Sequence, residues 1–404
     1  MDVKAVRFVR QSIVALGVVL IAAPSAFAQL RPEPDAVDLA PRELVDRLRA
    51  DPIAYFRFVN RPWIARVCEA FADVHDLPIV RLHGDAHVEQ FAVTKDAWGL
   101  DDFDDSARGP AVVDLVRFLG SIELALRQRG WTRDRHTLFD RFFSGYRKGL
   151  AEPDYRAPQP EIVARLRAEA TRSRVAFLVW GDKQMKPMSD ESMTAVVAAT
   201  DAISRVVYAD RPDLPPGYLT VVRAGWLHMG VGSAVAPKVL IRVRGPSADP
   251  EDDQLVEAKQ LRDLGGLRCL EPPPPAQPTL RVIVGTRQIG RLNPNILAAG
   301  PELVIPELVA RGRQLRDWWI RSWDPSYGEL HVGDLRSAHD LAAVAYDAGV
   351  QLGAGSLREE PESRAAPIRT RQLAALARLE RRISDETARL VDELLLGWKE
   401  LAVR

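Results

Sequence analysis

The stretch that decides the fold is residues 79–121, which read IVRLHGDAHVEQFAVTKDAWGLDDFDDSARGPAVVDLVRFLGS. Short apolar runs at 79–82, 91–94 and 98–100 predict strands. From 112 to 129 the apolar residues recur at helical spacing instead, which predicts a helix. The segment therefore predicts a small β structure that leads directly into a helix.

Ionisable side chains collect at the ends of these predicted strands. His83 and Asp85 follow the first strand, and the run 101–105, DDFDD, follows the third. Like charges this close repel one another, which favours either a solvated loop or neutralisation by a cation. Carboxylates that converge from two strand ends suit a hard divalent cation such as Mg²⁺ or Mn²⁺. The stretch therefore predicts a functional site as well as a fold.

Two chemistries fit these side chains. In phosphoryl transfer, Asp85 would orient or deprotonate a hydroxyl while Asp102 holds a metal ion against nucleotide phosphates. In metal-dependent hydrolysis, a mixed cluster of His83, Asp85, His87 and Asp102 would hold a metal ion that activates water. A third interpretation is a protein that binds a ligand or partner without turnover.

The composition narrows the choice of class. The 404 residues carry 55 Lys and Arg against 55 Asp and Glu, so no basic excess favours nucleic acid as a partner. Two cysteines, Cys68 and Cys269, are too few for a disulfide framework or a four-thiolate zinc site. Whether they pair with each other depends on the fold. Length and hydrophobic content indicate a globular chain with one large two-lobed domain or two domains.

Residues 1–28 resemble a secretory signal peptide. Lys4, Arg7 and Arg10 precede an apolar run at 13–23, and the segment ends with Ala26-Phe27-Ala28. The run is shorter than the roughly 20 apolar residues that a membrane span needs. We therefore expect cleavage after Ala28 and a periplasmic or secreted protein, with no membrane association beyond the export signal.

The remaining chain divides into three expected segments. A helical lobe with the motifs covers 29–215, a β-rich segment covers 216–295, and a helical C-terminal part at 296–404 packs on the first lobe. Within the β-rich segment, strands are expected at 218–222, 238–243 and 255–261.

The strings HGDAHVEQF (83–91) and DDFDDSARGPAVVDLVRFLGS (101–121) resemble those of the domain-of-unknown-function family 2252. That family is a relative of the aminoglycoside phosphotransferases and of the wider protein-kinase-like superfamily. The resemblance implies a two-lobed α+β fold, mostly helical with a small antiparallel sheet, in which the order of the lobes is circularly permuted. It also implies Mg²⁺ (or Mn²⁺) with ATP or another nucleotide, and an unknown small-molecule or protein acceptor.

The resemblance assigns roles to particular residues. Asp85 matches the catalytic aspartate, and His83 matches the histidine of the same motif. Asp102 matches the Mg²⁺-binding aspartate, and Asp114 matches a structural aspartate in the helix that follows. His87 matches a position typical of the subfamily, with no role assigned.

Two more metal ligands are expected, Asp104 and Gln90. Gln90 lies five residues after Asp85, where the family carries an asparagine. Glutamine keeps the carboxamide oxygen but is longer by one methylene, and metal sites tolerate only small changes in ligand position. This departure predicts a shifted backbone, a weaker metal site or a loss of activity.

The expected nucleotide contacts lie far downstream. The backbone amides of Gly230, Gly232 and Ser233 would cradle phosphates, as glycine-rich turns do. Lys259, in the run VEAKQ, would pair with those phosphates. Arg287, in the string RVIVGTR at 281–287, is a further candidate phosphate contact, although a structural ion pair fits it equally well.

Overall fold

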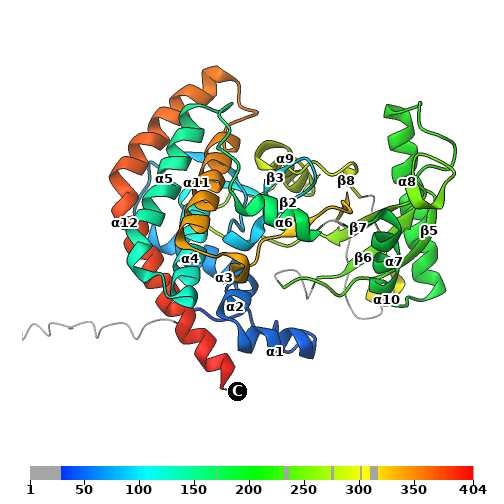
Figure 1. Cartoon of the computed structure of the whole chain (residues 1–404), viewed down its shortest axis with the longest axis horizontal. Helices are drawn as coiled ribbons and strands as arrows, with labels where there is room; N and C mark the ends of the chain where they lie inside the picture. Colours follow the sequence, from blue (N-terminus) through cyan, green and yellow to red (C-terminus); the bar gives the residue numbers. More distant parts are fainter. Residues whose placement is uncertain are drawn as a thin grey trace, which may run out of the picture.

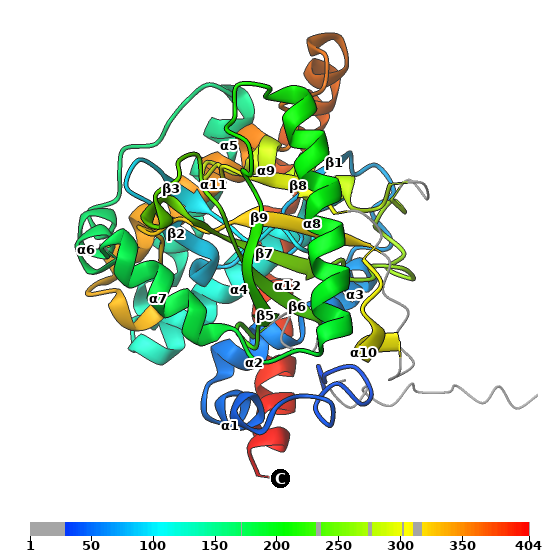
Figure 2. The same cartoon turned by 90° about the vertical axis from the view of Figure 1, so that its right-hand side faces the viewer.

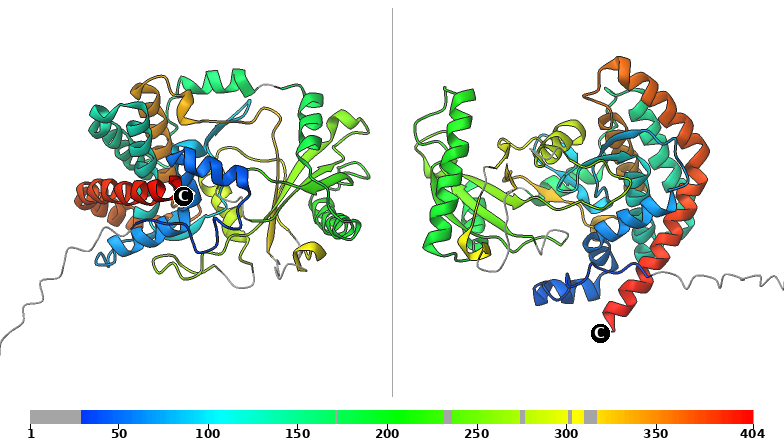
Figure 3. Two further views of the ribbon diagram at one scale, coloured as in Figure 1. Left: turned by 90° about the horizontal axis from the view of Figure 1, so that it is seen from below. Right: turned by 180° about the vertical axis from the view of Figure 1, so that it is seen from behind.

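A computed structural model describes residues 29–170, 172–231, 236–273, 277–300, 303–309 and 317–403. The expected signal peptide at 1–28 lies outside these residues. The expectation of an α+β fold with small antiparallel sheets is confirmed. Figures 1 and 3 show a helical part on one side of the molecule and a larger sheet on the other.

The helical part is built around α4 (Val112–Arg129), the helix expected at 112–129. Nearly all of its side chains are buried, because other helices cover it on several sides. Two of these, α5 and α11, approach each other closely: a Cβ on Gly149 would lie 2.1 Å from the carbonyl oxygen of Val350. The helices that pack on α4 are α2 (Pro52–Phe58), α3 (Asn60–Ala70), α5 (Arg135–Ala151), α11 (Ala338–Gly355) and α12 (Glu362–Ala402). Helix α1 (Arg42–Ala50) packs on α12 and α2.

Two small antiparallel sheets carry the motif loops. The strands expected at the start of the motif segment are confirmed as β1 (Ile79–Leu82), β2 (Phe91–Val93) and β3 (Trp98–Leu100). A fourth strand, β4 (Ala107–Pro110), pairs with β1, and β10 (Gly328–Glu329) pairs with β2. Short 3₁₀ turns are η1 (Val88–Gln90), η2 (Thr132–Asp134), η3 (Pro250–Asp252) and η4 (Val332–Asp334). The loops after β1 and β3 therefore leave neighbouring parts of the same small structure.

The larger sheet has five antiparallel strands in the order β5-β6-β7-β9-β8. Helix α8 (Asp190–Asp210) covers one face and α7 (Arg174–Gln184) packs on the other, as Figure 2 shows for α8. Two further helices, α9 (Leu280–Ile289) and α10 (Pro306–Val309), lie between β7 and β9 in the sequence, and α6 (Ile162–Ala170) precedes α7. The strands are β5 (Val221–Trp226), β6 (Lys238–Val243), β7 (Gln254–Gln260), β8 (Leu297–Ala299) and β9 (Trp318–Ser322).

This sheet extends past residue 295, where the sequence placed the end of the β-rich segment. Strands β8 and β9 follow that position, and β9 falls in a region expected to be mostly helical. The residues of β9, WWIRS, include two aromatic residues and an isoleucine and are buried except for Arg321, which suits a strand that pairs on both sides. The sheet part is therefore longer in sequence than expected.

Strand alternation divides the side chains of the larger sheet between its two faces. Residues such as Val239, Val256 and Ile320 pack in the core under α8. Because successive side chains of a strand alternate, the residues next to them in each strand point to the opposite face of the sheet, towards the helical part. Those neighbours are Lys238 on β6, Glu257 and Lys259 on β7, and Trp319 and Arg321 on β9.

Cys68 on α3 and Cys269 in the segment after β7 form a disulfide, with their Cα atoms 5.4 Å apart. The bond links the helical part to the connection that leaves the larger sheet. None of the helices in the described ranges has the length and apolarity needed to cross a bilayer.

Candidate functional site

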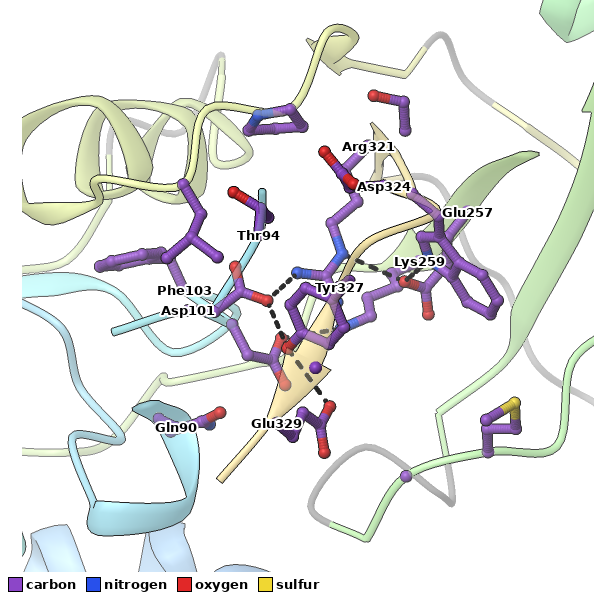
Figure 4. A pocket seen from close by; sticks show the side chains of 18 of the residues that line it. Gln90, Thr94, Asp101, Phe103, Glu257, Lys259, Arg321, Asp324, Tyr327 and Glu329 are labelled. Carbon is purple, nitrogen blue, oxygen red and sulfur yellow. Dashed lines mark hydrogen bonds and ion pairs between the residues drawn. The ribbon is translucent and has the colours of Figure 1, made fainter. Parts of the chain in front are cut away.

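A cavity of about 610 Å³ lies between the larger sheet and the motif loops (Figure 4). It gathers most of the site residues expected from the sequence: Asp85, Gln90, Asp102, Asp104, Gly230 and Lys259 all line it.

Three expected nucleotide contacts are not placed in this cavity. Arg287 lies on the exposed side of α9 and does not line it, so the expectation of a phosphate contact at Arg287 is not supported by its position. The reason is helical periodicity: Arg281, six residues earlier on α9, is the arginine that faces inward, where it donates hydrogen bonds to the carbonyl oxygens of Asp104 and Ser106. Gly232 and Ser233 lie outside the described residues.

Lys259 joins the two halves of the site. Its Nζ lies 2.8 Å from Oδ1 of Asp102 and 3.1 Å from Oδ2 of Asp104, although the sequence separates Lys259 from Asp102 by 157 residues. Burial disfavours the charged ammonium, but the two carboxylates outweigh it and raise the pKa of Lys259 above its usual range. The lysine is therefore a permanent cation between two acidic groups.

The two carboxylates beside Lys259 have opposite acidities. Burial would raise the pKa of Asp102, but Lys259 and Arg321 hold it well below its usual range. Burial and the neighbouring charge of Asp102 raise the pKa of Asp104 to about 7. Near neutral pH the pair is thus poised between one and two negative charges.

Asp102 also has a strained backbone. Its φ is +61°, in the left-handed region that residues other than glycine rarely adopt. Such conformations persist where the surrounding structure fixes them, and they cluster at functional sites. Here the ion pair with Lys259 is one of the contacts that fix it.

Asp85 lies in the loop after β1, and Arg117 on α4 holds it. Both Nε and Nη2 of Arg117 reach Oδ1 of Asp85, at 2.9 and 2.8 Å. Burial raises the pKa of Asp85 to about 6, although Arg117 opposes the shift. Nε2 of His87 lies 3.9 Å from the other carboxylate oxygen, Oδ2.

Asp114, at the start of α4, holds the loop that carries His83 and Asp85 through hydrogen bonds to its backbone. Its two carboxylate oxygens accept hydrogen bonds from the backbone amides of His83 and Gly84, at 2.7 and 2.8 Å. Gly84 has a φ of +84°, and a Cβ at this position would lie 1.8 Å from the carbonyl oxygen of Asp105. The loop that carries Asp85 is therefore packed directly against the loop that carries Asp102 and Asp104.

The two motif histidines are buried and differ in their contacts. His83 has both ring nitrogens engaged: Nε2 lies 3.0 Å from the carbonyl oxygen of Asp101, and Nδ1 accepts from the amide of Asp85 at 3.3 Å. Its ring packs on Phe103 at 4.5 Å between centroids. His87 has a buried Nε2 with no hydrogen-bond partner. Burial lowers the pKa of both histidines, so both are neutral near pH 7.

These contacts bear on the hydrolase interpretation. A metal site of His83, Asp85, His87 and Asp102 requires a free imidazole nitrogen on His83, and both of its nitrogens contact backbone groups. Among the residues that the structure describes, no group of three or more His, Cys, Asp or Glu side chains is arranged to hold a metal ion.

Gln90 belongs to η1 and connects the two loops through its backbone. Its amide donates to the carbonyl of His87 at 2.9 Å, and its carbonyl accepts from the amide of Asp101 at 2.8 Å. Its carboxamide side chain lines the same cavity as Asp102 and Asp104.

Several residues of the site were not expected from the sequence. Arg321 donates to Asp101 at 2.9 Å and to Glu257 at 3.2 Å, and the hydroxyl of Tyr327 donates to the same oxygen of Asp101 at 2.9 Å (Figure 4). Arg262 pairs with Asp105 at 2.6 Å and lines the cavity. The sequence of β9 gave no alternating signal for Arg321; once the strand is known, the alternation of side chains places Arg321 on the face opposite Ile320.

Comparison with known proteins gives one match, which covers the motif loops. Residues 41–176 match the model of DUF2252, a family described as an uncharacterized protein conserved in bacteria. The match contains both motif loops, α4 and α5. Neither a curated protein nor a solved structure matches the chain.

Proposed function

We propose that this protein is a phosphotransferase of protein-kinase-like architecture, which transfers a phosphoryl group from a Mg²⁺-nucleotide to a hydroxyl of an acceptor. The observation that carries the proposal is the contact of Lys259 with Asp102. Phosphoryl transfer by kinases requires a strand lysine for the phosphates and a loop aspartate for the metal ion, close together. In this chain those two side chains come from segments that are remote in sequence and lie 2.8 Å apart.

The arrangement of the larger sheet supports the same proposal. Kinases carry a glycine-rich loop, then a lysine on the third strand, and a helix after that strand. Here Gly230 lies between β5 and β6, Lys259 lies on β7, and α9 follows. The sheet follows the motif loops in the chain instead of preceding them, so we propose a circularly permuted order of lobes. One departure is that α9, LRVIVGTRQI, has no acidic residue to pair with the lysine.

The residues around Lys259 fit a divalent cation. Oxygen ligands suit Mg²⁺, and the candidates are the carboxylates of Asp102 and Asp104 and the carboxamide of Gln90. Oδ1 of Asp104 is buried and has no hydrogen-bond partner, so it has unused capacity to bind a cation. When bound, Mg²⁺ supplies neutralisation of phosphate charge.

Asp85 is the proposed base. Arg117 occupies Oδ1, which leaves Oδ2 to accept the proton of the acceptor hydroxyl. With a pKa of about 6, Asp85 is ionised at pH 7 and is a stronger base than an exposed aspartate. Asp114 and Arg117 position this group from α4.

A second candidate function is binding of a nucleotide without turnover. The observation that favours it is the tight pairing of Asp85 with the fully buried Arg117, because Arg117 occupies Oδ1 and opposes the rise in the pKa of Asp85 that burial causes. Gln90 in place of the family asparagine points the same way. The tests below separate the two functions.

We also propose that the protein is exported, to the periplasm or outside the cell. The disulfide between Cys68 and Cys269 supports this, since disulfides persist mainly in oxidising compartments. The proposal requires a source of nucleotide outside the cytoplasm.

The test is thermal unfolding with and without Mg-ATP, followed by a phosphoryl-transfer assay. A ligand that binds only the native state raises the melting temperature. We expect a rise for the wild type, none for Asp102→Ala and a smaller one for Lys259→Ala. Arg287→Ala, a basic residue outside the cavity, is the matched control and should keep the full rise.

Asp85→Asn separates the two candidates. Loss of transfer with the Mg-ATP stabilisation retained supports a phosphotransferase. Stabilisation without any transfer by the wild type supports binding without turnover. No stabilisation of the wild type at millimolar nucleotide, with either Mg²⁺ or Mn²⁺, would exclude both.

A further inference from the structure

Arg262 lies between the two motif loops and lines the cavity, although it comes from the segment after β7. Its Nη1 lies 2.6 Å from Oδ2 of Asp105. The same oxygen of Asp105 accepts a hydrogen bond from Nδ2 of Asn60 at 2.7 Å, and this Nδ2 also donates to the carbonyl of Gly84 at 3.0 Å. Gly84 is the residue before Asp85, so Asn60 and Asp105 fix the guanidinium beside the loop that carries the proposed base.

The guanidinium of Arg262 has donors to spare. An arginine side chain carries five N–H donors. Among the residues that the structure describes, Asp105 accepts the only hydrogen bond that this side chain donates. The side chain is 19% exposed, and it lines the cavity. Its remaining N–H groups are therefore available to a ligand in the cavity.

Nearby carboxylates keep Arg262 charged and show how close it lies to the reacting groups. Burial would lower the pKa of this arginine, but four carboxylates outweigh burial and raise the pKa above its ordinary value: those of Asp105, Asp85, Asp104 and Asp102. The same charge acts in return on Asp85, where it opposes the rise in pKa that burial causes. One permanent cation thus acts on the proposed base and on both proposed carboxylate ligands of the metal ion.

We propose that Arg262 is a further catalytic residue, whose guanidinium binds the phosphoryl group during its transfer. This inference rests on the proposed function. In that reaction the acceptor oxygen forms a bond to the γ-phosphorus while the bond from this phosphorus to the β,γ-bridging oxygen breaks. The acceptor proton goes to Asp85, and the electron pair of the broken bond stays on the nucleoside diphosphate. The transferring group carries charge on its three outer oxygens, and an arginine that is already in position stabilises this charge. Asp105 supplies the positioning, because it holds one nitrogen of the planar guanidinium and leaves the others to donate.

Thermal unfolding with Mg-ADP, alone and with aluminium fluoride, tests this role without an acceptor. Aluminium fluoride bound beside ADP imitates the transferring phosphoryl group, and mimics of a transition state bind more tightly than ground-state ligands. For the wild type we expect a rise in melting temperature with Mg-ADP and a second rise when aluminium fluoride is added. Arg262→Met should keep the first rise and lose the second, because the loss of a charge-assisted contact weakens binding of the mimic by about tenfold or more.

Two further variants and a control separate the proposed role from an effect on folding. Arg262→Lys keeps the positive charge but lacks the planar fork, so it should keep part of the second rise. Arg262→Gln retains a donor for Asp105 and replaces Arg262→Met if circular dichroism shows that the methionine variant does not fold. Arg174→Met is the matched control and should show both rises. Arg174 lines the same cavity from α7, where its guanidinium donates to the backbone carbonyls of Glu251 and Asp252.

The outcomes distinguish this inference from the proposed function. If Arg262→Met and Arg262→Gln show the second rise in full, the role of Arg262 is wrong and the proposed function stands. Loss of both rises in a folded variant assigns Arg262 to binding of the nucleotide and also overturns the catalytic role, as does loss of the second rise in Arg174→Met. If the wild type shows the first rise without the second, the result supports binding without turnover and the inference fails. If the wild type shows neither rise, both proposals fail.

Discussion

Asp104→Asn should change how the stability of this protein depends on pH. Asp104 is buried beside Asp102 and Lys259, and its pKa is raised to about 7 from the ordinary 3.8. Because the folded-state pKa is the higher one, the stability that it contributes is fully present below pH 3.8 and is lost as the pH rises through about 7. Asparagine resembles the protonated carboxyl and does not titrate, so the variant should not lose this stability.

The magnitude follows from the same pKa. Each pH unit between 3.8 and about 7 is worth about 1.4 kcal/mol, which gives an upper value of about 4 kcal/mol. Asp102 and Lys259 share the titration, so we expect a change of about 2–4 kcal/mol in the difference between variant and wild type from pH 4 to pH 8. Relative to the wild type, the variant should gain stability as the pH rises.

Urea unfolding of both proteins at pH 4, 6 and 8 measures this difference. Asp96→Asn, which changes an exposed aspartate in the turn between β2 and β3, is the matched control for the same substitution outside the cavity. Parallel pH profiles for Asp104→Asn and the wild type would refute the account of the site, since they would mean that Asp104 is an ordinary ionised carboxylate.

Two further predictions concern the scaffold. Gly84→Ala should lower the free energy of unfolding in urea by several kcal/mol, because a Cβ there would lie 1.8 Å from the carbonyl oxygen of Asp105. Gly130 is also at positive φ but has nothing within 4 Å of an added Cβ, so Gly130→Ala should lower it by only about 1 kcal/mol. Equal losses for the two variants would contradict the close packing of the two motif loops. Replacing Cys68 and Cys269 by serine should lower the free energy of unfolding by about 2–5 kcal/mol, because the bond closes a loop between residues 201 apart. An unchanged melting temperature under reducing conditions would show that the bond does not form.

The local structure of the motif segment was predictable because its signals are local. The strands β1, β2 and β3 and the helix α4 follow from apolar runs and from helical spacing within the segment itself. The boundary at 295 and the strand β9 were missed, because a short aromatic run such as WWIRS gives no sign of the partner strand with which it pairs. The pairing of β7 with β9 joins segments that are far apart in the sequence, so no local pattern predicts it.

The site was predictable in its residues and only partly in its contacts. Asp85, Asp102 and Lys259 were singled out before their positions were known, but the contact of Lys259 with Asp102 depends on how two remote segments meet. Arg117 was overlooked, although an arginine inside an otherwise apolar helix signals a buried acidic partner. The sequence did not show that Arg281 faces inward while Arg287 is exposed, because choosing between two arginines of α9 requires knowing which side of the helix is buried.

The length and position of α12 affect how this chain reaches its native state. α12 packs against α4 and α1, and near its end the backbone of Glu393 accepts a hydrogen bond from the amide of Leu30. The ribosome synthesises the chain from its amino terminus, so α4 is made long before α12, the helix that covers it. Until residues 362–402 are made, the nascent polypeptide exposes apolar surface that invites aggregation, and holding chaperones must shield it. Truncation before α12 should consequently produce insoluble protein, even though every motif residue would still be present.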